Sequence, residues 1–287
     1  SISLIFLMII VGGLTRLTNS GLSITQWELF TGIFPPLNEQ GWINYFNLYK
    51  KIPQFEILNS DMTMNEFKVI FYWEYFHRLL GRFIGIFFLI PLIYFSIKKK
   101  LNKKLLIKFF FVFLLIVFQG IIGWYMVESG LINNTSVSHY RLSLHLIMAF
   151  LIISILYWSY LNILNTKDKL FFNFKKKLLK FLFFLILTQI VFGAFVSGLD
   201  AGMIYQTWPK MNMSYLPDDI EFRRLEIISI FNEQSIVQLI HRCMAYFIFF
   251  IVLFLGVKMY LIEKQLYLRS YLILLFVILS QIFLGIF

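Results

Sequence analysis

Three histidines lie inside long apolar stretches of the sequence. His77, His145 and His241 each fall within roughly the first two turns of a predicted helix that enters a membrane from the same side. An imidazole is costly in hydrocarbon unless it is paired, binds a metal or lines a wet cavity. Any one of them could be a packing residue, but three at one depth favour a functional site.

The residue types narrow the kind of metal that these histidines could bind. Zinc prefers nitrogen and sulfur ligands gathered around one point, whereas this sequence has one cysteine and no carboxylate cluster at ligand spacing. Haem iron takes two axial ligands on opposite faces of a flat ring, which two facing helices of a four-helix bundle can supply. We therefore predict haem iron as the metal, with His77 and His145 as one ligand pair and His241 in a second.

A carboxylate accompanies the first pair. Glu74 precedes His77 by three residues, so the two side chains share one helix face. It could accept a proton beside a substrate held by His77, although an interfacial glutamate near a helix N-terminus is an ordinary feature. Gln238 takes the same place before His241, which predicts reaction in the first half of the chain and a resident cofactor in the second.

Two arginines and one further histidine lie near the candidate ligands. Arg78 and Arg242 each follow a ligand directly and could pair with haem propionates, or could extend to the membrane surface. His139 lies six residues before His145, which turns it to another face of the helix. We interpret His139 as an interfacial residue and assign it no role.

The composition indicates which elements must position these residues. The chain has 287 residues, of which 59% are apolar and 14% charged, too few charges for a soluble domain. Apolar runs near the roughly 20 residues that span a bilayer recur along it. We predict an all-α polytopic membrane protein. Its expected helices cover residues 1–17, 71–97, 105–127, 139–163, 178–199, 236–262 and 269–287.

The net charge of +11 does not indicate nucleic acid as a partner. Most lysines lie in two short segments between apolar runs, Lys98–Lys108 and Lys167–Lys180. Basic loops of this kind stay on the cytoplasmic side of a membrane. The long segments Thr18–Ile70 and Asp200–Ser235 are then expected outside, and membrane lipid is the expected surrounding.

An internal repeat organises the chain. The matching segments are Val11–Trp27 with Phe192–Trp208, offset by 181 residues, His77-Arg78 with His241-Arg242, offset by 164, and Gln119–Gly123 with Gln281–Gly285, offset by 162. Their order is the same in both halves, which predicts two tandem, parallel four-helix-bundle repeats, residues 1–170 and 171–287. A complete second repeat would add an eighth helix after Phe287, with the counterpart of His145 near position 307, which is 145 plus the offset of 162.

Several segments together resemble the haem A synthase family, with a likeness that covers essentially the whole chain. They are Gly12–Ser23 with Trp27 and Pro35-Pro36, Glu74–Arg82, Gln119–Trp124, Tyr140–His145 and Gly198–Gly202. The resemblance implies an eight-helix enzyme that oxidises the C8 methyl group of haem O to the formyl group of haem A, which serves haem-copper oxidases.

The resemblance also implies residue roles and partners. His77 and His145, with Glu74 as the catalytic carboxylate, would hold haem O, while His241 would bind a haem b cofactor together with a histidine beyond residue 287. The expected partners are a haem O synthase, cytochrome oxidase assembly factors and further copies of the chain in a homo-oligomer. The expected location is a bacterial inner membrane, ahead of a mitochondrial one.

Two other functions are open from the residues alone. A di-haem cytochrome b that only carries electrons would keep both haems unchanged and would not need Glu74. A transporter with parallel repeats would place the histidines along a path and would purify without haem. The sequence specifies neither the electron donor nor the source of the formyl oxygen.

Overall fold

The structure is a computed structural model that describes residues 1–28, 31–132, 134–164, 176–220, 229–263 and 268–286. Within these ranges the regular structure is helical, with one isolated β-bridge between Met211 and Ser214. The helices are α1 Ile2–Leu17, α2 Glu39–Tyr49, α3 Pro53–Leu58, α4 Met64–Ile97, α5 Lys103–Glu128, α6 His139–Ile163, α7 Lys176–Gly198, α8 Gln234–Glu263 and α9 Leu268–Ile286. Phe287 and part of the expected basic segment 167–180 lie outside the described residues.

Six of the described helices, α4 to α9, are long and apolar enough to cross a membrane. The predicted all-α polytopic membrane class is therefore confirmed. Helix α1 is also apolar but has 16 residues, about 24 Å of helix against a hydrocarbon thickness of about 30 Å.

Helix α4 begins at Met64, seven residues before the predicted start. Thr63 caps it: the threonine hydroxyl accepts from the backbone N–H of Glu66, whose carboxylate accepts from the Thr63 backbone. With 34 residues, the helix is about 51 Å long, so about 20 Å of it extends beyond the hydrocarbon. His77 consequently lies near the fourth turn of its helix, and the prediction of the first two turns was wrong for this residue.

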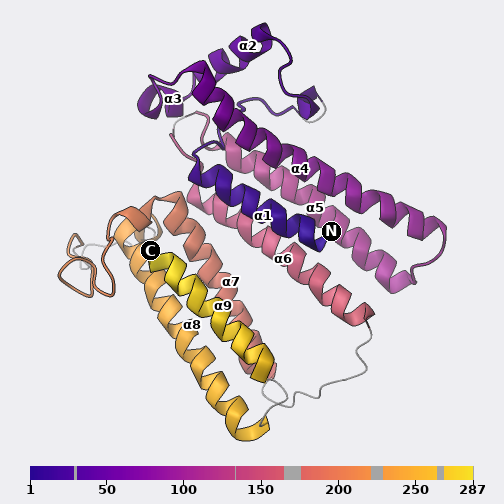
Figure 1. Cartoon of the computed structure of the whole chain (residues 1–287), viewed down its shortest axis with the longest axis vertical. Helices are drawn as coiled ribbons and strands as arrows, with labels where there is room; N and C mark the ends of the chain where they lie inside the picture. The colour runs from indigo at the N-terminus through magenta and orange to yellow at the C-terminus, as the bar shows by residue number, and fades with distance from the viewer. Residues whose placement is uncertain (29–30, 133, 165–175, 221–228, 264–267, 287) are drawn as a thin grey trace. The chain divides into compact units, whose positions relative to one another are not determined.

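The chain divides into two compact units, Ser1–Lys169 and Leu170–Phe287. In the first unit, α1, α4, α5 and α6 form a closed four-helix bundle, in which α1 and α5 each contact both α4 and α6. Figure 1 shows these four helices running side by side. Helices α4 and α6 therefore occupy opposite corners of the bundle. Val112 and Ile152 are among the most deeply buried residues of its core.

An aromatic cluster outside the bundle fixes the outer segment of the first unit. Trp42, Phe46 and Tyr49 of α2 pack against Phe67 and Phe71 in the first turns of α4. Figure 1 shows α2 and α3 at the beginning of α4. Burial raises the pKa of Tyr49 above its ordinary value. The extension of α4 is therefore part of a small soluble-type core rather than of the membrane span.

The second unit contains α7, α8 and α9, with α8 in contact with both other helices. Its core includes Leu182 of α7 and Ile248, Val252 and Leu255 of α8. Gly256 of α8 has no room for a Cβ because the ring of Tyr271 on α9 occupies that space. Close helix approach at this glycine holds α9 against α8.

Candidate functional site

The structure brings His77 and His145 to opposite sides of the first bundle. His77 lies on α4 and His145 on α6, the two corners that are separated by α1 and α5. Two histidines from facing helices are the arrangement that axial ligation of a flat macrocycle requires.

Each of the three histidines packs against a glycine of a neighbouring helix. A Cβ placed on Gly12 of α1 would lie 3.0 Å from Cε1 of His77, and one on Gly123 of α5 would lie 3.1 Å from Cε1 of His145. In the second unit, a Cβ on Gly193 of α7 would lie 3.2 Å from Cε1 of His241. Because ordinary carbon contacts are about 3.5–4.0 Å, only a glycine leaves each ring in its observed position without a shift.

Two of these histidines also contact a glutamine one turn before the glycine. Nε2 of Gln119 donates to the backbone oxygen of His145 at 2.9 Å and lies 3.2 Å from Nδ1 of the ring. Nε2 of Gln189 donates to the backbone oxygen of His241 at 3.1 Å and lies 3.3 Å from Nε2 of its ring. Each amide therefore touches both the ring and the main chain of one histidine.

Several buried polar atoms around these histidines have no hydrogen-bond partner. They are Nδ1 of His77, Nδ1 of His241, Oε1 of Gln119 and Oε1 of Gln189. Such atoms are costly unless a ligand, ion or water completes them. Among the described residues, no three His, Cys, Asp or Glu side chains gather as a metal cluster. These residues thus fit a haem iron with two axial imidazole ligands, because unpaired ring nitrogens are available to bind it.

Glu74 is buried, with 3% of its surface exposed. One carboxylate oxygen, Oε2, accepts from the Ser23 hydroxyl at 2.7 Å and from the Ile24 backbone N–H at 2.8 Å. The other, Oε1, accepts from Nε and Nη2 of Arg78 at 3.0 and 2.6 Å. Four donors on one buried carboxylate hold its negative charge in place.

Arg78 and Arg242 bind the outer segments of their own units in the same way. Nη2 of Arg78 donates to the Ile24 carbonyl at 2.7 Å, and Nη2 of Arg242 donates to the Tyr205 carbonyl at 2.7 Å. Ile24 and Tyr205 differ by the repeat offset of 181 residues. The predicted propionate contacts would have to share guanidinium groups that already hold these carbonyls, and they stay predictions.

The segments held by these arginines begin with the same backbone turn. Asn19 follows α1 with φ 50°, and Asp200 follows α7 with φ 53°, again at the offset of 181 residues. Asn and Asp are the non-glycine residues that tolerate this left-handed conformation best. Each unit therefore enters its outer segment through a left-handed residue, and the arginine next to a candidate histidine holds that segment by a backbone carbonyl.

His139, to which no role was assigned, is the first residue of α6. Its ring contacts the ring of Tyr140, with centroids 4.0 Å apart. It lies about 1.7 turns before His145 on the same helix.

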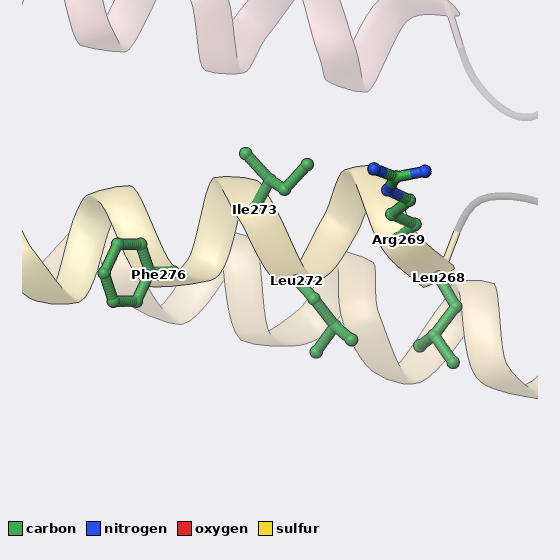
Figure 2. Close-up of a pocket in the computed structure, with 5 residues that line it drawn as sticks. All are labelled: Leu268, Arg269, Leu272, Ile273 and Phe276. Atoms are coloured by element: carbon green, nitrogen blue, oxygen red, sulfur yellow. The ribbon is translucent and has the colours of Figure 1, made fainter.

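One pocket of the second unit lies away from all the candidate residues. It has a volume of about 640 Å³ and is lined by Leu268, Arg269, Leu272, Ile273 and Phe276 of α9. Figure 2 shows these side chains along successive turns of one helix, with Arg269 at the first turn. It brings together no groups for chemistry, and none of the predicted site residues lines it.

Sequence reasoning did not assign a role to Gln119, Gln189 or Ser23. A signal for the glutamines is present, because a glutamine precedes a glycine by four residues in Gln119–Gly123, Gln189–Gly193 and Gln281–Gly285. This spacing puts both side chains on one helix face. No comparable pattern marks Ser23, which reaches Glu74 only because the outer segment folds back.

Comparison with known proteins gives a consistent match. A family model described as cytochrome oxidase assembly protein matches residues 1–287. A protein named "Heme A synthase" from Pelagibacter ubique is 50% identical over 99% of this chain and 84% of its own length. Proteins of the same name from Parvibaculum lavamentivorans and Ehrlichia canis are 43% and 45% identical over 85% and 86% of this chain, and 71% and 72% of their own lengths. No solved structure matches the chain.

Proposed function

The chain belongs to the cytochrome oxidase assembly protein family, and we propose how its residues divide the work of that family's reaction. Its activity is haem A synthesis, in which an oxidoreductase embedded in the membrane acts on haem O to form haem A. A haem-related cofactor belongs to this activity. Which haem and which residues bind it are the subject of the proposal.

The first unit is proposed to hold the substrate, haem O, between His77 and His145. The observation that carries this assignment is the glycine-seated histidine pair on opposite helices of one closed bundle. The glycines bring the backbones of α1 and α5 close to the two rings. Two neutral imidazoles suit an iron porphyrin better than a site of gathered carboxylates and thiolates would.

The second unit is proposed to hold haem b as a resident cofactor through His241. Gly193 and Gln189 seat this histidine in the way that Gly123 and Gln119 seat His145. By the repeat, its partner histidine corresponds to His145 and would lie near position 307, outside the sequence given. When bound, haem b would supply one-electron transfer between the substrate site and an external acceptor.

Glu74 is proposed as the catalytic carboxylate of the first unit. Turning a methyl group into a formyl group adds one oxygen atom and, counted with water as the source of that atom, releases four protons and four electrons. A buried carboxylate one turn from His77 can accept such a proton or stabilise positive charge that develops nearby. The Ser23 hydroxyl has a second acceptor, the Ile70 carbonyl, which lies 3.3 Å from its oxygen. It can therefore stop donating to Glu74 and still keep a hydrogen bond.

The surroundings of the enzyme complete the proposal. The six long apolar helices make the chain an integral membrane protein, and the proposed membrane is the bacterial plasma membrane, because the relatives named above are bacterial. A haem O synthase is the proposed source of the substrate. Oxidase assembly factors are proposed to receive the product, and a homo-oligomer is the proposed state of the chain.

Extraction and mass analysis of the haems in the purified protein test this proposal. We expect haem b together with haem O or haem A in the unmodified protein, and loss of haem A formation in Glu74→Ala and in His77→Ala. His241→Ala should lose haem b. Haem b alone, at two per chain and unaffected by Glu74→Ala, would instead identify an electron carrier, while a protein without any haem would contradict both assignments.

A further inference from the structure

We propose that Gln119 and Gln189 are positioning residues that fix the rotation of the haem-ligating rings of His145 and His241. The inference rests on the proposed function, because it takes these histidines to be axial ligands. It concerns two partly buried glutamines that neither the family match nor the names of the relatives assign to any role.

Each amide is placed to control its histidine at two points. Nε2 of Gln119 donates to the His145 backbone oxygen at 2.9 Å and lies 3.2 and 3.3 Å from the two ring nitrogens. Gln189 makes the matching pair of contacts with His241. One contact holds the helix turn that carries the ligand, and the other limits rotation of the ring about its χ angles.

The glycine one turn later contacts the same ring. Gly123 and Gly193 bring α5 and α7 against Cε1 of the two histidines. The amide and the glycine of one helix therefore both restrict how each imidazole can turn. The orientation of the ring is then set by the neighbouring helix as well as by the ligand's own helix.

The amides act on these histidines through their N–H groups. Oε1 of Gln119 and Oε1 of Gln189 are buried and have no partner, and neither does Nδ1 of His241. The contacts to the backbone oxygen and to the ring are all made by Nε2 of the amide. A methionine would fill the same space without burying an unpaired oxygen, so these N–H contacts are what the glutamine adds.

The contacts around His77 differ, because no glutamine lies four residues before its glycine, Gly12. Met8 precedes Gly12 by four residues, where Gln119 precedes Gly123 and Gln189 precedes Gly193. The methyl group of Met8 instead lies 3.3 Å from the Cβ position of Gly81 on α4, and Nδ1 of His77 has no partner. The ligand that lacks an amide belongs to the proposed substrate site, where a haem must enter and leave.

The test measures the reduction potential of haem b in the purified full protein, for the unmodified chain, Gln189→Met and Gln189→Glu. Gln189→Met removes the amide contacts that orient the His241 ring, so the ring binds ferric iron less well and the ferrous form should become more stable relative to the ferric form. We expect a shift of about tenfold in the ferrous-to-ferric ratio, which for one electron is about 59 mV upward. Glutamate has a similar reach but no N–H group to donate to the His241 backbone oxygen, so Gln189→Glu should not restore the native potential.

Gln238→Met is the matched control. Gln238 is a buried glutamine three residues before His241 on α8, and its amide donates to the Tyr205 carbonyl at 3.0 Å. It should leave the potential unchanged. Equal potentials in all four proteins, or equal shifts for Gln189→Met and Gln238→Met, would overturn the positioning role.

His241→Ala separates this inference from the proposal on which it rests. Retention of haem b by His241→Ala would contradict the ligand assignment itself. Loss of haem b in His241→Ala, combined with an unchanged potential in Gln189→Met, would overturn only the role of the amide. Electron paramagnetic resonance of the ferric protein gives a second readout, because freer ring rotation in Gln189→Met should broaden or shift the low-spin signal while Gln238→Met keeps it.

Discussion

Replacing Gly123 by alanine tests directly whether the contact with this glycine positions the ring of His145. The new Cβ would lie 3.1 Å from Cε1 of the ring, whereas carbon atoms normally approach to about 3.5–4.0 Å, so the ring must retreat by about 0.5 Å. That shift reaches the tolerance of about 0.5 Å within which a binding constellation works. Nε2 of Gln119 contacts the ring nitrogens and donates to the His145 backbone oxygen, so the ring cannot shift freely.

The expected result is about tenfold weaker binding of haem O in Gly123→Ala, which corresponds to about 1.4 kcal/mol. Stability against unfolding should change little, because alanine gains up to about 1 kcal/mol of helix propensity over glycine while the contact opposes it. Titration of the haem-free protein with haem O, followed by absorbance, measures the affinity, and denaturant unfolding measures the stability.

Gly120→Ala is the control on the same helix. Nothing lies within 4 Å of a Cβ at Gly120, so this variant should gain helix stability and bind haem O like the unmodified chain. Equal affinities of Gly123→Ala and Gly120→Ala would refute the reasoning that the glycine seats the ligand.

Three further predictions follow from the contacts. Glu74→Gln leaves the guanidinium of Arg78 without its buried partner, so we expect a loss of about 3 kcal/mol in stability and faster limited proteolysis of the segment that Glu74 holds; unchanged cleavage would contradict the anchoring role. Met8→Gln adds the amide that the seat of His77 lacks, and should slow haem loss from the first unit, measured by transfer to an apoprotein acceptor. Burial and hydrogen bonds to Asp219 and Asp218 raise the pKa of Tyr205 from 10.0 to about 12. Its contribution to stability is therefore complete below about pH 10 and is lost as the pH rises through about 12; Tyr205→Phe should remove that alkaline transition, as followed by proteolysis of the second outer segment.

The membrane-spanning helices could be predicted from apolar run length, because lipid requires a continuous apolar surface and satisfied backbone groups. The start of α4 could not. Its first turns carry Asn65, Glu66 and Lys68 and are stabilised by the aromatic cluster of α2 and α3 rather than by lipid. Short helices such as α2 and α3 depend on tertiary packing, so their own sequences predict them poorly.

The candidate histidines could be predicted because an imidazole in a membrane helix is rare and expensive. The glycines that contact these histidines could not be predicted in the same way. Whether Gly123 meets His145 or lipid depends on which helix face turns toward which neighbour, and that follows from packing of the whole bundle. The same limit applies to Arg78 and Arg242. Their guanidinium groups donate to carbonyls of the outer segments, and only the folding of these segments brings the carbonyls near.

The assignment of the two histidine sites is tested most directly by haem analysis of His145→Ala and His241→Ala beside the unmodified protein. The account predicts that His145→Ala keeps haem b but forms no haem A from supplied haem O, while His241→Ala loses haem b. Haem A formation by His145→Ala at the native level, or loss of the same haem in both variants, would contradict the division into a substrate site and a cofactor site.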